Sequence, residues 1–190
     1  RTRLVKNSFY TGAALIFIGL TPFIFNFFIG RTFGAETLGS INIIINFCLI
    51  ITIFISNFFG SAGNKYLAEF RGRNYLDNFI HTFKIIFFGS TFFLIIIGII
   101  LYVNWNYFFN KFSLPENLLI PIIFYIFLRT IYILLRKTLY GMDLVRHYAY
   151  NEIFAAIFMF AMIGYVCYND VPNFLIHTYL VSYFIFLILC

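Results

Sequence analysis

Residues 7–30 read NSFYTGAALIFIGLTPFIFNFFIG and contain no charged side chain. A helix of about 20 apolar residues, rising 1.5 Å per residue, crosses the ~30 Å hydrocarbon core of a bilayer. Five further apolar stretches follow along the chain, so the sequence predicts an all-α integral membrane protein, a bundle of six transmembrane helices. The expected spans are about 9–29, 41–59, 85–103, 118–135, 153–168 and 174–190.

The composition excludes an ordinary water-soluble domain. Hydrophobic residues make up 62% of the chain and charged residues only 11%, with a mean hydropathy of +0.92. Soluble domains contain about 25% charged residues. The net charge of +6 does not indicate a nucleic-acid partner, because the basic residues flank the apolar stretches, where they would meet anionic lipid headgroups.

Basic residues are sorted between alternate connections. The N-terminal tail, the second connection and the fourth connection carry three, four and three of them, whereas the first, third and fifth carry one, one and none. Lys and Arg remain on the cytoplasmic side of multi-pass membrane proteins. The N-terminus and the even-numbered loops are therefore expected to face the cytoplasm, and the chain is expected in the cell (plasma) membrane.

Twelve of the 13 basic residues lie in the tail and the connections, and the remaining one, Arg129, lies inside the fourth span. A charge at such depth is costly, so it should face a wet cavity or a partner. Tyr125, Arg129, Tyr132, Arg136 and Tyr140 share one helical face by their spacing. Such a face suits a phosphate-bearing, sugar-bearing ligand, because guanidinium pairs bidentately with phosphate and tyrosine combines an apolar ring with a polar tip. The alternative is that Arg129 extends toward the inner headgroups or forms a structural pair.

Asparagine side chains form a second set of candidate substrate-binding residues. Asn42 and Asn46 are one helical turn apart in the second span, and Asn26 lies in the first. They would either line a polar path or form hydrogen bonds between helices.

The sequence predicts no enzyme, no metal site and no cofactor. Cys48, Cys167 and Cys190 fall in expected spans and form no CxxC or Cys/His cluster. No expected span contains Asp or Glu, since Glu152 is assigned to a cytoplasmic segment, 136–152. The other cytoplasmic segment, 64–84, should be a short amphipathic element in which Glu69 pairs with Arg73.

Three local sequences resemble a known family. Residues 30–39 (GRTFGAETLG), 60–72 (GSAGNKYLAEFRG) and 135–142 (LRKTLYGM) resemble, in the same order, segments of polysaccharide flippases. These form the O-antigen translocase-like, oligosaccharide-lipid branch of the multidrug/oligosaccharidyl-lipid/polysaccharide exporter superfamily. Gly34 and Gly39 would permit a tight turn between the first two helices.

The resemblance implies one N-terminal lobe, residues 1–190, of a two-lobe flippase. The start at Arg1 and the end inside an apolar run fit a piece of a longer chain. The implied activity is alternating-access transfer of a polyprenyl-(di)phosphate-linked oligosaccharide to the outer leaflet, with Arg129, Arg136 and Arg31 holding the phosphate. The implied partners are this lipid-linked oligosaccharide, membrane lipids and the glycosyltransferases or polymerase of polysaccharide assembly.

Two alternatives remain open. The first is an exporter of another cargo in the same superfamily, a drug or a cell-wall lipid precursor. The second is a membrane-embedded glycosyltransferase, which would need acidic residues on an outer loop. The outer loops offer only one each, Glu36, Glu116 and Asp170.

Overall fold

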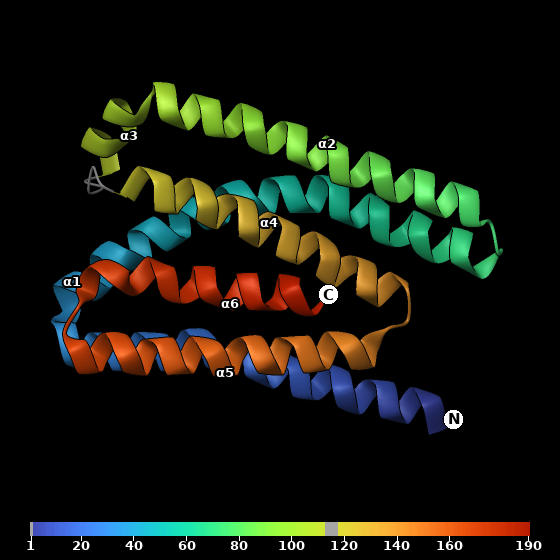
Figure 1. Cartoon of the computed structure of the whole chain (residues 1–190), viewed down its shortest axis with the longest axis horizontal. Coiled ribbons are helices and arrows are strands. Elements are labelled where there is room, and N and C mark those ends of the chain that lie inside the picture. The colour runs from blue at the N-terminus through green and yellow to red at the C-terminus, as the bar shows by residue number, and fades with distance from the viewer. Residues whose placement is uncertain (1, 113–117) are drawn as a thin grey trace. The chain divides into compact units, whose positions relative to one another are not determined.

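A computed structural model describes residues 2–112 and 118–190, so Pro115 and Glu116 of the expected third loop lie outside the described residues (Figure 1). Every regular element in these ranges is helical, which confirms the all-α prediction. In chain order the elements are α1 (Thr2–Gly72), α2 (Leu76–Val103), α3 (Trp105–Phe112), α4 (Leu119–Gly141), α5 (Val145–Asn169), the short 3₁₀ helix η2 (Pro172–Phe174) and α6 (Leu175–Leu189).

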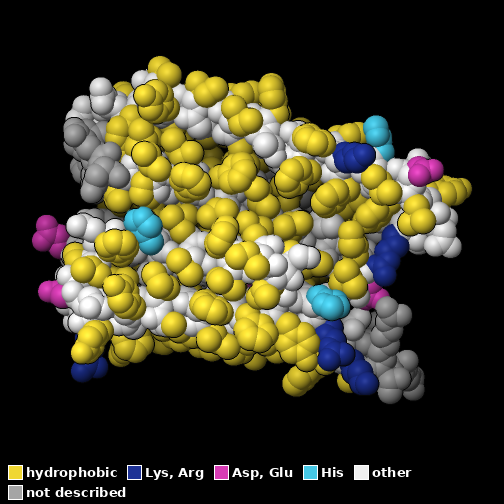
Figure 2. Space-filling view, in the orientation of Figure 1, with side chains coloured by type: hydrophobic (Ala, Val, Ile, Leu, Met, Phe, Trp, Pro, Cys, Tyr) yellow, Lys and Arg dark blue, Asp and Glu magenta, His cyan; other side chains and the backbone are white. Residues whose placement is uncertain are grey.

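Five helical segments in the described ranges are long and apolar enough to cross a membrane: α1, α2, α4, α5 and η2 with α6. Large apolar side chains cover their outer surfaces. Phe58, Phe88 and Ile120 are each more than 60% exposed. Figure 2 shows this apolar surface, with the charged side chains gathered toward the helix ends. These features are compatible with a multi-pass membrane protein.

Helix α1 reverses its direction at Gly34. The backbone there has φ 84° and ψ 173°, outside helical geometry. Asn42 Nδ2 donates to Asn26 Oδ1 at 3.3 Å, although residues 16 apart in a straight helix would lie about 24 Å apart. The predicted turn is thus confirmed at Gly34. Gly39 was wrongly assigned to it, because Gly39 lies in helical backbone.

The chain divides into two compact units, and the first contains residues 2–45 and 145–190. Helices α5 and α6 run antiparallel and are joined by η2 (Figure 1). Ser182 Oγ donates to the Ala155 carbonyl at 3.1 Å, which ties α6 to α5. The rings of Phe25 and Tyr179 lie 4.9 Å apart and join α1 to α6.

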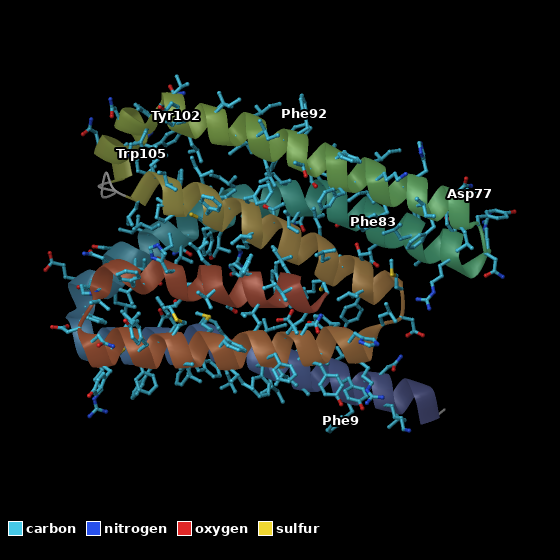
Figure 3. The ribbon with its side chains drawn as sticks, in the orientation of Figure 1. Phe9, Asp77, Phe83, Phe92, Tyr102 and Trp105 are labelled. Carbon is cyan, nitrogen blue, oxygen red and sulfur yellow. The ribbon has the colours of Figure 1, made fainter. Side chains whose placement is uncertain are left out.

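The second unit contains residues 46–144, in which α2 packs on α4 and on the second part of α1. Phe59 and Phe93 have ring centroids 5.5 Å apart. Phe83 lies with Ile131 and Leu134 around a small cleft between α2 and α4. Phe92, by contrast, is exposed on the other side of α2 (Figure 3).

Three expected connections are wrong in detail. Residues 64–84 form no separate amphipathic element, because α1 continues to Gly72 and α2 begins at Leu76. The supposed segment 136–152 consists mainly of the ends of α4 and α5. The third loop contains α3. The sequence analysis ended each apolar stretch where charged residues begin, but the helical backbone continues through these charged residues. The Glu69–Arg73 ion pair is confirmed at 2.8 Å.

Replacing Gly34 with alanine tests the reversal. A φ of 84° with a ψ near 180° is accessible almost only to glycine, so the variant should lower the free energy of unfolding by about 1–3 kcal/mol. Gly39→Ala is the matched control, since it lies in helix and an added Cβ there would meet nothing within 4 Å. Denaturant unfolding in detergent, followed by circular dichroism, measures both. Equal stability of the two variants would contradict a strained reversal at Gly34.

Candidate functional site

The predicted face of tyrosines and arginines lies on α4. Arg129 Nη1 donates to the Tyr125 hydroxyl at 2.9 Å, and its guanidinium carbon lies 5.8 Å from the centre of the Tyr125 ring. About two helical turns further along α4, Arg136 Nη1 lies 3.5 Å from the Tyr132 hydroxyl. Tyr125 is fully buried and Tyr132 nearly so, whereas Tyr140 is partly exposed. The structure thus joins four of the predicted residues into two Tyr–Arg pairs.

Arg129 points away from the C-terminal end of α4. Its partner Tyr125 is one turn nearer to the helix N-terminus, and side chains in a helix tilt toward that terminus. Arg129 lies ten residues after Leu119 and twelve before Gly141, about 15 and 18 Å along the axis. The guanidinium therefore lies near the middle of the helix. This geometry disfavours the alternative in which it extends toward headgroups at the α4 C-terminus.

The second part of α1 packs beside α4 through small side chains. Cys48, Thr52, Ser56 and Gly60 recur every four residues and are buried, a pattern that lets membrane helices approach closely. An added Cβ at Gly60 would meet Lys137, and one at Gly141 would meet Asn64, so both contacts join residues 77 apart. A constant separation at two levels means that the two helices run parallel.

Lys137 links these two helices, and sequence analysis missed this role. Its Nζ donates to the Ser56 carbonyl at 3.1 Å and to Asn57 Oδ1 at 3.2 Å. Gly60 makes room for it, because an added Cβ there would lie 2.7 Å from Lys137 Cδ. The sequence signal was the small-residue spacing around Gly60 opposite a basic residue at the end of a span.

The other predicted binding residues are Arg31, Asn42 and Asn46. Asn42 bonds to Asn26 across the α1 reversal, which matches the structural alternative for this pair. Asn46, one turn further along, is exposed. Arg31 is exposed near the reversal and belongs to the first unit, whereas both Tyr–Arg pairs belong to the second.

Glu152 is a further residue that sequence analysis misassigned. It lies within α5 rather than in a connection, and only 5% of it is exposed. Its neighbour Asn151 is also buried and donates to Cys190 Sγ at 3.4 Å. Contrary to the expectation, one of the helices long and apolar enough to cross a membrane, α5, therefore contains an acidic residue. The reason is that the expected span was begun at Ile153, immediately after the charged Glu152, whereas α5 begins at Val145.

Within the described ranges, no group of three or more His, Cys, Asp or Glu side chains is arranged to hold a metal ion. The cationic stripe of α4, formed by Arg129 and Arg136, lies on one side of a mainly apolar helix. Its chemistry suits an anion, since a guanidinium can donate two parallel hydrogen bonds to one phosphate.

Comparison of the chain with protein-family models, with curated proteins and with solved structures finds no match.

The link through Lys137 can be tested by substitution. Lys137→Met keeps the aliphatic stem but removes two hydrogen bonds of a charged donor, so the free energy of unfolding should fall by about 1–3 kcal/mol. Gly60→Ala should have a similar effect, because it displaces the same side chain. The double variant should therefore cost clearly less than the two single costs together. Gly164→Ala, with open space around it, is the control, and strictly additive effects would refute the link.

Proposed function

We propose that this chain is a transport lobe that moves a polyprenyl-(di)phosphate-linked oligosaccharide from the cytoplasmic to the outer leaflet. The observation that carries the proposal is Arg129, a cation near the middle of an apolar helix whose guanidinium is held by the buried Tyr125 hydroxyl. Such a residue is retained in a membrane helix where it serves a ligand path or a partner.

We further propose six crossings, with the N-terminus in the cytoplasm of a cell that carries the protein in its plasma membrane. Residues 5–72 of α1 would extend about 100 Å as one straight helix, more than three times the hydrocarbon thickness. The reversal at Gly34 supports two crossings from this helix. The distribution of Lys and Arg supports the orientation.

The spacing of the two pairs on α4 suits an anionic headgroup in transit. Arg129 and Arg136 are seven residues apart, about 10 Å along the helix, so they offer two successive anion-binding positions on one face. A phosphate could bind at either level through the planar fork of the guanidinium. Tyrosine rings on the same face suit the apolar faces and hydroxyl groups of a sugar. Arg31, Asn42 and Asn46 are further candidate contacts in this proposal.

A second candidate is an exporter of another cargo, such as a drug or a cell-wall lipid precursor. The buried carboxylate of Glu152 in α5 is the observation that favours it, since acidic groups in membrane helices often bind coupling ions or cationic ligands. It ranks second because the cationic stripe, rather than a carboxylate, dominates α4.

A reconstituted flipping assay tests the proposal. Full-length protein in liposomes would be given a fluorescent polyprenyl-diphosphate oligosaccharide, and transfer between leaflets would be followed by accessibility to a membrane-impermeant quencher. Arg129→Gln should reduce the rate roughly ten- to hundredfold, because a charged hydrogen bond contributes about 1.5–3 kcal/mol. Arg71→Gln, at an exposed helix end, is the control. A well-folded parent that moves no cargo would refute the proposal, and an unchanged Arg129→Gln rate would remove Arg129 from it.

The orientation makes a separate prediction. In a variant whose three cysteines are replaced by alanine, a cysteine introduced at Arg31 should react with an impermeant maleimide added outside intact cells. A cysteine introduced at Arg73 should react only after the cells are opened, because it lies in the basic connection. Both native side chains are exposed. The reverse pattern would contradict the assigned orientation.

A further inference from the structure

Cations and tyrosines gather at one end of the first unit, where α1 and α5 begin. The rings of Tyr10 on α1 and Tyr150 on α5 have centroids 6.1 Å apart. Lys6 and Arg146 each lie one turn before these tyrosines, so the two cations and the two rings have the same separation of 140 residues. Figure 1 shows that both helices start at the same end of this unit. Their parallel course therefore brings Lys6 and Arg146 to one level, as the Lys6–Arg146 cluster.

Arg146 is exposed, yet Tyr150 orders its side chain. The guanidinium carbon lies 5.5 Å from the centre of the Tyr150 ring, and the two side chains share a hydrogen bond. A guanidinium has several N–H donors in one plane, so a single bond to a hydroxyl leaves donors for a further ligand. A planar fork held in place by an aromatic ring suits bidentate binding of a phosphate.

The charge of the Lys6–Arg146 cluster is not cancelled within the first unit. The acidic residues of this unit are Glu36, Glu152 and Asp170. Glu36 and Asp170 lie about 35–45 Å away along the helices, and Glu152 is buried. Asp143 is exposed three residues before Arg146, but one carboxylate does not neutralise two cations. The cluster is therefore a site for an anion.

The surface beside the cluster favours a lipid over a water-soluble anion. On α5, Arg146 begins an exposed helical face that continues with Tyr150, Phe154 and Ile157, each of the three more than 40% exposed. Cation, tyrosine and hydrocarbon side chains thus follow one another in the order of phosphate, glycerol and acyl chain in a phospholipid. On α1, Phe9 is 74% exposed and points outward close to Lys6 (Figure 3). A free anion would make no use of this apolar surface.

We propose that the Lys6–Arg146 cluster binds the phosphate of one anionic phospholipid of the surrounding bilayer, such as phosphatidylglycerol. Arg146 donates to the phosphate oxygens, Lys6 adds a second positive charge, and Tyr150 and Phe154 contact the glycerol and the upper part of one chain. Basic pockets between membrane helices bind anionic headgroups in this way. The proposal requires that the chain lies in a membrane, and it is independent of the cargo and of the Tyr–Arg pairs on α4.

Native mass spectrometry of the purified full chain, released from detergent, can count bound lipids. The protein would be titrated with phosphatidylglycerol or with phosphatidylcholine of the same chains. We expect one phosphatidylglycerol to bind at least about tenfold more tightly, because two cations interact with its net negative charge. Equal binding of the two lipids would overturn the proposal. Displacement by an equal concentration of glycerol phosphate would also overturn it, since the site would then recognise a free anion.

Substitution locates the site. Arg146→Gln should weaken phosphatidylglycerol binding about five- to tenfold and Lys6→Gln about fivefold, whereas phosphatidylcholine binding should not change. Arg71→Gln is the matched control, because it removes the same charge from another exposed helix end. It should bind phosphatidylglycerol like the parent. Equal losses in Arg146→Gln and Arg71→Gln would mean general attraction between the basic chain and acidic lipid, and would overturn the proposed site.

Discussion

The structure depends on the requirement that polar groups inside hydrocarbon form their hydrogen bonds within the protein, since no water is present to accept them. Hydroxyl side chains satisfy this requirement on their own helices. Thr130 and Thr138 of α4 donate to carbonyls one turn earlier at 2.8 and 2.9 Å, and Ser90 of α2 donates to the Phe87 carbonyl at 2.9 Å. The same rule governs the charged residues of α4, whose partners are a tyrosine one turn earlier for Arg129 and a neighbouring helix for Lys137.

This requirement gives the sides of α4 different roles. One side carries the Tyr–Arg pairs, with each guanidinium directed by a hydroxyl toward the helix N-terminus. Another side meets the parallel part of α1 along small residues, and Lys137 joins the two helices there. The opposite side forms an apolar groove with α2, whose walls include Leu94 and Phe127. A single helix therefore combines a candidate anion path, a structural contact and one wall of an apolar groove.

Hydropathy predicted the apolar centre of each long helix and the helical class, because it measures where hydrocarbon can be. It did not predict where helices end, since α1 and α5 continue through charged residues that lie beyond the apolar centre. Glu152 was misassigned for this reason. The helix α3 was also missed, because its eight residues are too few and too polar for a span.

The four-residue spacing of tyrosine and arginine correctly predicted which α4 side chains share a face. It could not reveal the contact of Lys137 with Ser56, which joins residues 81 apart. It also could not reveal the groove, which exists only where α2 and α4 meet. Pairings of this kind depend on tertiary packing, whereas periodicity describes one helix at a time.

The central claim is that Arg129 provides a binding site for a lipid-borne phosphate within the membrane-crossing part of α4. Thermal unfolding of the purified protein with farnesyl diphosphate or with farnesol, which has the same chain without phosphate, tests this claim most directly. The account predicts that the diphosphate raises the melting temperature more than the alcohol and that Arg129→Gln removes the difference. Equal stabilisation by the two compounds, or a difference that persists in Arg129→Gln, would contradict it.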